Sequence, residues 1–252
     1  MIGIQLYTVR TLLENEAAAD KTIAALGEMG YECIQLFGGT TNLNMMRWCV
    51  NAARKYGLKV IGMLSNPISL RESFNEITEI AREAECSDIG ISGAAKTEGE
   101  ARELVMTANA LANDVHSAGF TFSYHNHSHE FIRTECGETV MDILLGGFDE
   151  ELVDLMPDTY WLQHGGVDVR DFIETHADRI KMLHLKDMKR ALDGPTFAEV
   201  GVGNINMKGI IKLALSLGIS DFIVEQDQCD GDPLVSAKIS IDNIKKILKE
   251  ER

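Results

Sequence analysis

One unit recurs along the whole chain and constrains its fold more than any other feature: a short β-like run precedes a longer segment with helical periodicity. In the first unit, the run from Ile2 to Tyr7 is followed by an amphipathic segment from Leu12 to Met29 that ends at Gly30. Strand starts fall near residues 2, 31, 58, 88, 120, 152, 180 and 221. The first six spacings are 27 to 32 residues, and the last is 41. Eight units of nearly equal length predict a closed α/β fold, the (β/α)8 TIM barrel.

An open, doubly wound sheet is the alternative fold. It usually has fewer strands and carries a nucleotide-binding glycine loop after the first one. Here Tyr7-Thr8-Val9-Arg10 follows the first run and lacks that glycine pattern. No linker or long charge block divides the chain, so we expect a single domain over residues 1–252. The surplus of the longest unit, Lys189 to Asn206, is expected to form an irregular loop on the active face.

The remaining elements are predicted from the same periodicity. We expect strands at about 2–7, 33–36, 59–63, 88–92, 120–127, 152–161, 180–186 and 222–225. We expect helices at about 12–29, 41–56, 72–86, 97–118, 137–146, 168–178, 206–217 and 235–250. Gly30, Gly57 and Gly119 stand where a left-handed residue ends a helix. Segment 45–48, with two methionines and a tryptophan, should pack the second helix on the barrel or form a subunit contact.

The composition restricts the partners and the compartment. Asp and Glu number 39 and Lys and Arg number 24, which gives a formal net charge of −15. This charge repels phosphate backbones and anionic lipid, so we expect neither a nucleic-acid nor a membrane partner. The chain has no long apolar run, and its five cysteines form no C-x-x-C pair. Since the start at Gly3-Ile4-Gln5 does not resemble a secretion signal, we expect a cytoplasmic protein with reduced thiols.

Ionisable side chains concentrate at the predicted carboxyl ends of strands five to eight, the end of a TIM barrel where active sites lie. Two or three carboxylates with an imidazole suit Mn²⁺, Mg²⁺, Co²⁺ or Zn²⁺, and no thiolate favours a softer metal. Four such residues at the same end of successive strands favour a metal site over separate structural roles. We predict a divalent ion there, with Mn²⁺ favoured, and the ligand set Glu130, Asp158, His184 and Glu225.

Two more histidines and a lysine share these strands. His125 and His127 are two residues apart, so they point to one side of strand five. They could be extra ligands, a general base, or hydrogen-bond partners of substrate hydroxyls. Lys186 lies two residues beyond His184 and faces the same side. It could hold a substrate oxygen anion or pair with a carboxylate at the rim.

Four residues are candidate substrate contacts that could equally serve packing. Gln5 and Tyr7 end the first strand, and the Trp161 ring could pack against a sugar face. Glu199 opens the segment 199–206, which has two glycines and precedes a helix. Such a segment could cradle a phosphate, but the charge of Glu199 opposes this. We therefore interpret the segment as a turn with a substrate contact.

Short motifs mark the strand ends through essentially the whole chain. They are Gly3-Ile4-Gln5-Leu6-Tyr7, Tyr124-His125-Asn126-His127 with Glu130-Phe131, Asp158 with Trp161 and Gly166, His184-Leu185-Lys186-Asp187, the Glu199 to Asn206 loop, and Val224-Glu225. Each is weak alone, but the set resembles the sugar phosphate isomerase/epimerase family of xylose-isomerase-like barrels. That superfamily includes tagatose and psicose epimerases, inosose isomerases and dehydratases, and endonuclease IV.

The resemblance implies a divalent metal held by a Glu on strand five, an Asp on strand six, a His on strand seven and a Glu on strand eight. Asp158, His184 and Glu225 match the last three directly. On strand five, His125 stands where many members have a glutamate. Either His125 replaces that ligand or Glu130 supplies it, and we favour Glu130 because it restores three carboxylates around the ion.

The resemblance also implies a metal-dependent isomerase or epimerase of a sugar, keto-sugar or cyclitol. In such enzymes two opposed groups exchange a proton next to a carbonyl that the metal polarises. Here Glu225 and either His125 or His127 would form that pair, with Lys186 beside them. An inosose-type dehydratase begins with the same proton abstraction and is the main alternative. An abasic-site endonuclease, which the −15 charge disfavours, and a non-catalytic sugar-binding barrel are the others. The oligomeric state, including a homo-oligomer, stays open.

Overall fold

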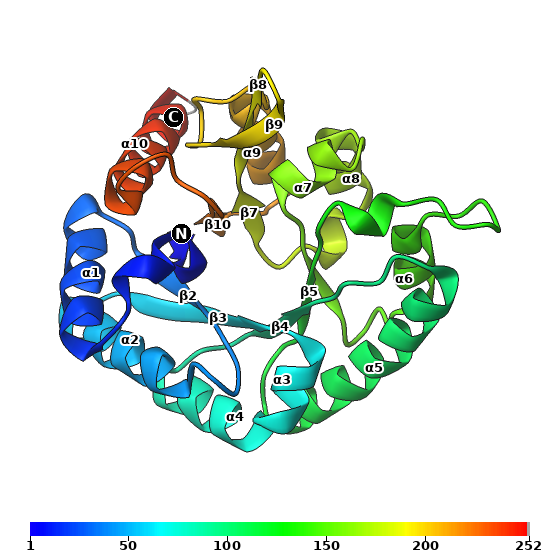
Figure 1. The fold of residues 1–252 in the computed structure, drawn as a ribbon, viewed down its shortest axis with the longest axis horizontal. Coiled ribbons are helices and arrows are strands. Elements are labelled where there is room, and N and C mark those ends of the chain that lie inside the picture. Colours follow the sequence, from blue (N-terminus) through cyan, green and yellow to red (C-terminus); the bar gives the residue numbers. More distant parts are fainter. Residues whose placement is uncertain (251–252) are drawn as a thin grey trace.

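The eight predicted strands form one parallel sheet that curls into a nearly closed barrel (Figure 1). The computed structural model describes residues 1–250. Neighbouring strands follow the order β6-β5-β4-β3-β2-β1-β10-β7, and isolated parallel bridges at Leu155–Ile180 and Asp158–His184 join the two edges. The (β/α)8 TIM barrel is thereby confirmed. Its strands are β1 (Ile2–Gln5), β2 (Cys33–Phe37), β3 (Lys59–Ser65), β4 (Ile89–Ser92), β5 (Ser123–His125), β6 (Asp154–Met156), β7 (Leu183–Leu185) and β10 (Phe222–Val224).

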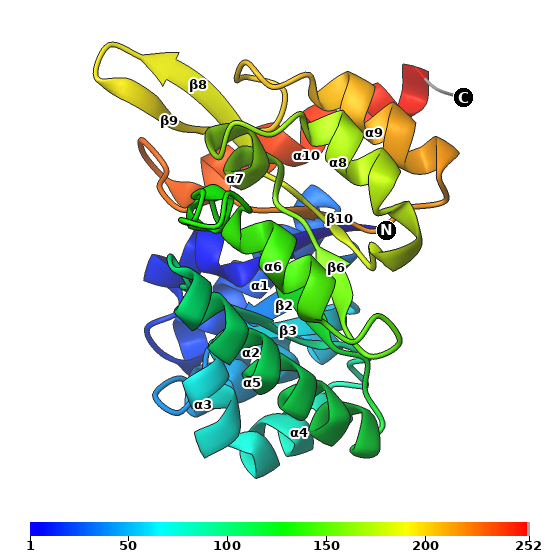
Figure 2. The ribbon, with the colours of Figure 1, turned by 90° about the vertical axis from the view of Figure 1, so that its right-hand side faces the viewer.

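Helices cover the outside of the barrel, as the side view in Figure 2 shows. The first begins after Asn15, whose side chain accepts a hydrogen bond from the Ala18 amide. It ends at Gly30, and Gly30, Gly57 and Gly119 have φ of 92°, 74° and 95°, so the predicted left-handed residues are confirmed. The helices are α1 (Glu16–Met29), α2 (Leu43–Tyr56), α3 (Pro67–Glu72), α4 (Phe74–Glu83), α5 (Glu98–Ser117), α6 (Val140–Gly147), α7 (Thr159–His164), α8 (Val169–Thr175), α9 (Met207–Ser216) and α10 (Pro233–Glu250), with 3-10 helices η1 (Leu6–Leu12), η2 (His129–Phe131) and η3 (Ala177–Arg179).

The strands are short, buried runs because parallel strands in a barrel are covered on both faces. All four residues of β1 are buried. Cys33, Met156, Met182 and Ile223 form a separate buried cluster between strands. Gly3 leaves room for this packing, since a Cβ at that position would lie 2.5 Å from Cys33 Sγ. The segment 45–48 packs α2 on the barrel, with Met46 1 % exposed in the core.

Three predicted elements differ from the structure. The sixth strand ends at Met156, because Pro157 and the α7 cap at Asp158 stop it, so residues 159–161 of the predicted strand lie in α7. Predicted helix 72–86 corresponds to α4, which ends at Glu83, and the unpredicted α3 precedes it and meets it at Ser73. The predicted first helix from residue 12 begins only at residue 16, after η1.

The surplus between β7 and β10 is also not an irregular loop throughout. It contains an antiparallel hairpin, β8 (Asp187–Ala191) and β9 (Gly194–Ala198), which projects from the barrel in Figure 2. The two residues between the strands form a turn of the length most common in β-hairpins. The sequence analysis did not predict this hairpin. Within residues 1–250, the structure contains no helix with the length and apolar character that a membrane crossing requires.

Candidate active site

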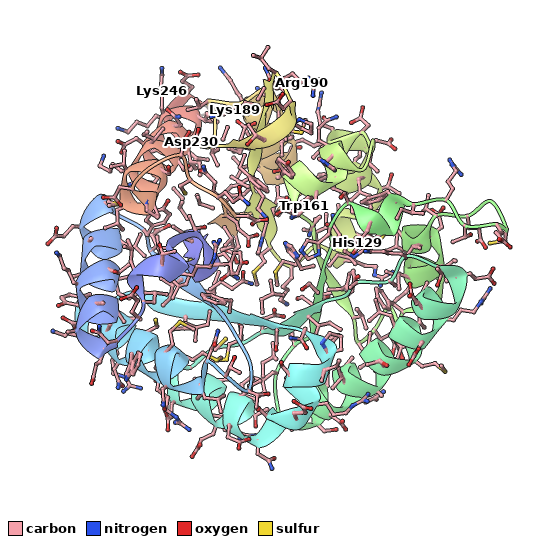
Figure 3. All side chains as sticks on the ribbon, in the orientation of Figure 1. His129, Trp161, Lys189, Arg190, Asp230 and Lys246 are labelled. Carbon is pink, nitrogen blue, oxygen red and sulfur yellow. The ribbon has the colours of Figure 1, made fainter. Side chains whose placement is uncertain are left out.

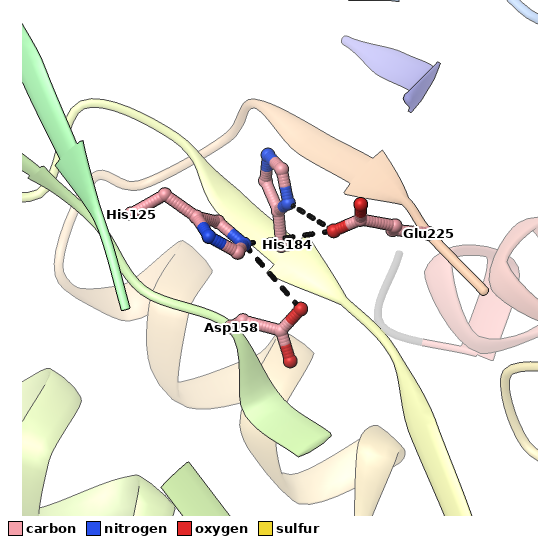
Figure 4. A group of neighbouring side chains, drawn as sticks. All are labelled: His125, Asp158, His184 and Glu225. Atoms are coloured by element: carbon pink, nitrogen blue, oxygen red, sulfur yellow. Dashed lines mark hydrogen bonds and ion pairs between the residues drawn. The ribbon is translucent and has the colours of Figure 1, made fainter. Parts of the chain in front are cut away.

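Four ionisable side chains from four strands of the barrel converge at its carboxyl end (Figure 4). His125 ends β5, Asp158 follows β6, His184 lies in β7 and Glu225 follows β10. One ligand atom of each residue lies within 4.8 Å of the ligand atoms of the other three. The side chains are buried, at 0 to 6 % exposure. The structure thus brings together three of the four predicted ligands, and we name these four residues the His2AspGlu group.

The turn after β6 positions Asp158. As the N-cap of α7, Asp158 accepts a hydrogen bond at Oδ1 from the Trp161 amide at 3.0 Å, which leaves Oδ2 for the group. The Asp158 amide donates to Asn126 Oδ1 at 3.0 Å and so ties the end of β6 to the end of β5. Sequence reasoning assigned no role to Asn126, although its place between two site histidines marks it as a neighbour.

The donor atoms of the His2AspGlu group fit a divalent cation. Both ring nitrogens of His125 and Nε2 of His184 are buried without a hydrogen-bond partner. Buried polar atoms are normally paired, and a cation among them would supply that pairing. His184 Nδ1 lies 2.8 Å from Glu225 Oε2, and His125 Nε2 lies 3.6 Å from Asp158 Oδ2. Two imidazoles and two carboxylates form a site for a hard or borderline ion such as Mn²⁺ or Zn²⁺.

Lys186 lies beside the group and is 1 % exposed. Its Nζ is 2.9 Å from Asp158 Oδ2, 3.2 Å from Glu225 Oε2 and 2.8 Å from Asp227 Oδ1. Burial lowers the pKa of Lys186, but the three carboxylates outweigh burial and raise it, so the amine stays protonated. Sequence reasoning left Asp227 unassigned, yet it lies two residues beyond Glu225, the same spacing that identified Lys186.

The three site imidazoles have different protonation. Burial opposes a charge on His125, but the Asp158 and Glu225 carboxylates raise its pKa to about 9. Burial, with the positive charges of His125 and Lys186, lowers the pKa of His127 to about 3, so this ring is neutral at pH 7. Burial also lowers the pKa of His184. The two carboxylates of the group have pKa values lowered by Lys186 despite their burial.

Glu130, the favoured strand-five ligand in the sequence prediction, lies outside the His2AspGlu group. Its side chain is fully buried, and its Oε1 accepts a hydrogen bond from Tyr124 Oη at 2.9 Å. Its Oε2 accepts from the His127 amide at 3.0 Å. The η2 turn therefore directs Glu130 toward Tyr124 and into a second group with His127 and His129. The structure places His125, and not Glu130, beside the other three residues.

A cavity of about 350 Å³ opens onto the group. Its lining includes Tyr7, His125, His127, Lys186, Glu225 and Asp227. Tyr7, a predicted substrate contact, meets the Phe37 ring edge-on with centroids 5.2 Å apart. The remaining lining residues come from the ends of β2 to β4 and from the segments that follow these strands, and they are uncharged.

The other predicted substrate contacts lie outside this lining. Gln5 is fully buried, and its Nε2 donates to Gln35 Oε1 at 2.7 Å. Trp161, labelled in Figure 3, packs beside the site. Its ring centroid lies 5.3 Å from Lys186 Nζ and 5.4 Å from the ring centroid of His127. Glu199 faces α10, where its Oε1 accepts from Ser236 Oγ at 2.7 Å.

The glycines of segment 199–206 surround a carboxylate of the protein itself. Asp187 accepts hydrogen bonds from the amides of Gly201, Gly203 and Ile205 at 2.9 to 3.1 Å. A Cβ at Gly203 would lie 2.3 Å from Asp187 Oδ1, so only glycine fits there. These hydrogen bonds hold the segment against the start of β8. Because the three amides donate to Asp187, they are not available to bind a phosphate.

The sequence as a whole matches a family model described as xylose isomerase-like TIM barrel over residues 23–247. The chain belongs to the xylose isomerase-like TIM barrel family. Inosose dehydratase of Salmonella typhimurium is 28 % identical to this chain over 160 residues, which cover 56 % of this chain and 52 % of that protein. The chain thus spans about half the length of the curated relatives it matches.

Solved structures share the fold over nearly the whole chain. A sugar phosphate isomerase/epimerase from Parabacteroides distasonis superimposes with a TM-score of 0.79 and 24 % identity, covering 97 % of both chains. A xylose isomerase-like TIM barrel protein from Mycobacterium smegmatis in complex with magnesium gives a TM-score of 0.67 at 15 % identity, covering 95 % of this chain and 91 % of that one. At these identities the likeness establishes the architecture.

Proposed function

We propose that the chain is an isomerase or epimerase of a small sugar, keto-sugar or cyclitol that depends on one divalent ion, with Mn²⁺ favoured. The convergence of His125, Asp158, His184 and Glu225 at a polar cavity carries this proposal. These four residues would hold the ion, with His125 as the ligand from β5. When bound, a divalent ion supplies Lewis-acid polarisation of a substrate carbonyl.

The residues left over for proton transfer are His127 and Lys186. His127 lines the cavity and is neutral at pH 7, so its lone pair can accept the proton next to the carbonyl. The Lys186 ammonium lines the same cavity and can stabilise the negative charge that develops on the carbonyl oxygen. Return of the proton by His127 to the former carbonyl carbon, with transfer of the hydroxyl proton between the two oxygens, gives isomerisation. Protonation of the original carbon from its other face gives epimerisation, and the Lys186 ammonium is the protonated group available for that step, with solvent restoring both residues.

A dehydratase is the second candidate function. The curated relatives are inosose dehydratases, and loss of water begins with the same proton abstraction. The difference lies in the next step, in which a hydroxyl on the adjacent carbon leaves in place of proton return. A cytoplasmic location and the lack of nucleic-acid and membrane partners stay predictions.

Isotope exchange in deuterated water tests the proposal. The Mn²⁺-loaded protein is incubated with a panel of ketoses, keto-sugars and inososes, and the products are examined by NMR and mass spectrometry. We expect deuterium at the carbon next to the carbonyl, with no exchange by the Asp158→Asn variant treated in the same way. Products lighter by one water would assign the dehydratase reaction. No exchange and no water loss across the panel would contradict both.

A further inference from the structure

We infer that the substrate is an uncharged polyhydroxylated compound, such as a free ketose or cyclitol, without a phosphate or carboxylate group. This inference rests on the proposed metal site and adds to it the charge of the ligand. Three features of the cavity carry it: the charge balance of the site, the cations available to the ligand, and the uncharged wall from β2 to β4.

Charges in the metal-loaded site cancel. A divalent ion and the Lys186 ammonium carry three positive charges, and Asp158, Glu225 and Asp227 carry three negative ones. All three carboxylates lie within 3.2 Å of Lys186 Nζ. The two histidine ligands bind a metal as neutral imidazoles. No surplus positive charge remains for a phosphomonoester, which carries about 1.5 to 2 negative charges at pH 7.

No other cation reaches the cavity from residues 1–250. Lys186 is the one lysine or arginine in its lining. Arg10 lies behind Tyr7, with its guanidinium carbon 4.0 Å from the Tyr7 ring centroid. Its Nη1 donates to the carbonyl oxygens of Tyr7 and Asp227, both at 2.8 Å. This guanidinium therefore connects two loops at the edge of the cavity. Recognition of a phosphate or carboxylate would ordinarily use such a group.

Two glycines in the lining are explained by packing. Gly38 and Gly39 precede α2, a position where a phosphate-binding loop could occur. The Gly38 amide already donates to Leu64 O at 3.0 Å. A Cβ at Gly38 would lie 2.9 Å from Asn42 Cβ, and one at Gly39 would lie 2.3 Å from Ser69 Cβ. Close approach of α2 and α3 therefore requires these glycines.

The wall formed by β2 to β4 suits hydroxyl groups. Its polar side chains, including Ser65, Asn66 and Ser92, are hydroxyls and amides, which both donate and accept hydrogen bonds as sugar hydroxyls do. Ser65 Oγ is buried without a partner in the protein, so a substrate hydroxyl can pair with it. Tyr7 and Phe37 add an aromatic surface for the C–H face of a ring.

Binding of matched compounds tests the inference without requiring turnover. The Mn²⁺-loaded protein is titrated calorimetrically with D-fructose, D-tagatose and D-ribulose and with their terminal monophosphates, and with scyllo-inosose and myo-inositol. We expect at least one uncharged compound to bind, and its phosphate to bind at least about 10-fold more weakly. A phosphate that binds as tightly as its free sugar, or failure of every uncharged compound to bind, overturns the inference.

Two variants add direction to this test. Ser65→Ala should weaken binding of the uncharged ligand by about 2- to 10-fold, while Ser216→Ala, at the end of α9, should not. Ser92→Lys adds a cation to the wall and should improve binding of the phosphate relative to the free sugar. Unchanged selectivity in Ser92→Lys counts against the charge argument. Binding of a free sugar without isotope exchange would leave the inference standing and contradict the isomerase proposal.

Discussion

The two halves of the barrel mouth differ in charge. The strands β1 to β4 end in uncharged side chains, whereas β5, β6, β7 and β10 lead into imidazoles, carboxylates and a lysine. Buried charges persist only where partners neutralise them, and here Lys186 contacts three carboxylates at once. The charged half can therefore bind a cation and move protons, and the uncharged half can recognise hydroxyls and support the barrel.

The largest expected effect comes from substituting Asp158 in the charged half. Asp158→Asn keeps a good N-cap for α7 but removes a negative ligand, because Asn and Asp cap helices about equally. We expect the affinity for Mn²⁺ to fall at least about 100-fold, since loss of even an outer partner of a ligand costs about 10- to 100-fold. Equilibrium dialysis with metal analysis measures this. Asp168→Asn, at the exposed cap of α8, is the matched control and should keep wild-type affinity.

Lys186→Met, which keeps the length of the side chain and removes its charge, should impair catalysis but leave the metal site intact. We expect turnover to fall about 100- to 1000-fold, the loss typical for one group that stabilises a developing oxyanion. The bound metal should remain, since Lys186 is no ligand. Exchange rates and metal content of the same sample separate the two outcomes. If Lys186→Met turned over substrate at the wild-type rate, Lys186 would serve charge balance alone. The control is Lys181→Met, at a lysine whose side chain is 45 % exposed.

In the uncharged half, Gln35→Met should affect stability without affecting metal binding. Gln35 accepts the Gln5 Nε2 hydrogen bond, and both residues are fully buried. Removing the acceptor leaves a buried donor unpaired, which lowers the free energy of unfolding by about 1 to 3 kcal/mol. Urea unfolding measures this loss. A lower affinity for a bound sugar at unchanged stability would instead support the predicted substrate contact at Gln5.

A pH-dependent effect concerns Asp88, a buried carboxyl just before β4 at the opposite end of the barrel. Burial raises its pKa to about 7, although Ser123 and Thr121 donate hydrogen bonds to it. Between pH about 4 and 7 the unfolded chain loses this proton first, so the free energy of unfolding falls as the pH rises. The slope is at most about 1.4 kcal/mol per pH unit. Asp88→Asn should flatten it in urea unfolding at several pH values, whereas the exposed Asp178→Asn should leave it unchanged.

Periodicity predicted the barrel and much of the charged half, because strand position determines which end of the barrel a residue occupies. Strand position alone was enough to predict that four residues lie at the site: Asp158, His184, Glu225 and Lys186. Strand position was not enough to predict where the Glu130 side chain points. Its direction depends on the η2 turn and on the hydroxyl of Tyr124, six residues earlier. A spacing argument cannot supply that geometry.

The uncharged half and the connections were harder to predict for a related reason. Gln5 lies at the predicted strand end, but its buried partner Gln35 comes from the adjacent strand, and the sequence does not pair strands residue by residue. Trp161 was predicted in a strand, and Pro157 with the cap at Asp158 was the available signal for α7. Asp187 lies fourteen or more residues before the three amides of segment 199–206 that donate to it.

Anomalous diffraction from crystals of the Mn²⁺-loaded protein tests most directly whether one ion binds between the four strands. We predict a single strong peak at about 2.0 to 2.3 Å from one donor atom each of His125, Asp158, His184 and Glu225. Glu130 should remain bonded to Tyr124, away from the peak. No peak among these residues, or a peak bonded to Glu130 in place of His125, would contradict the proposed centre.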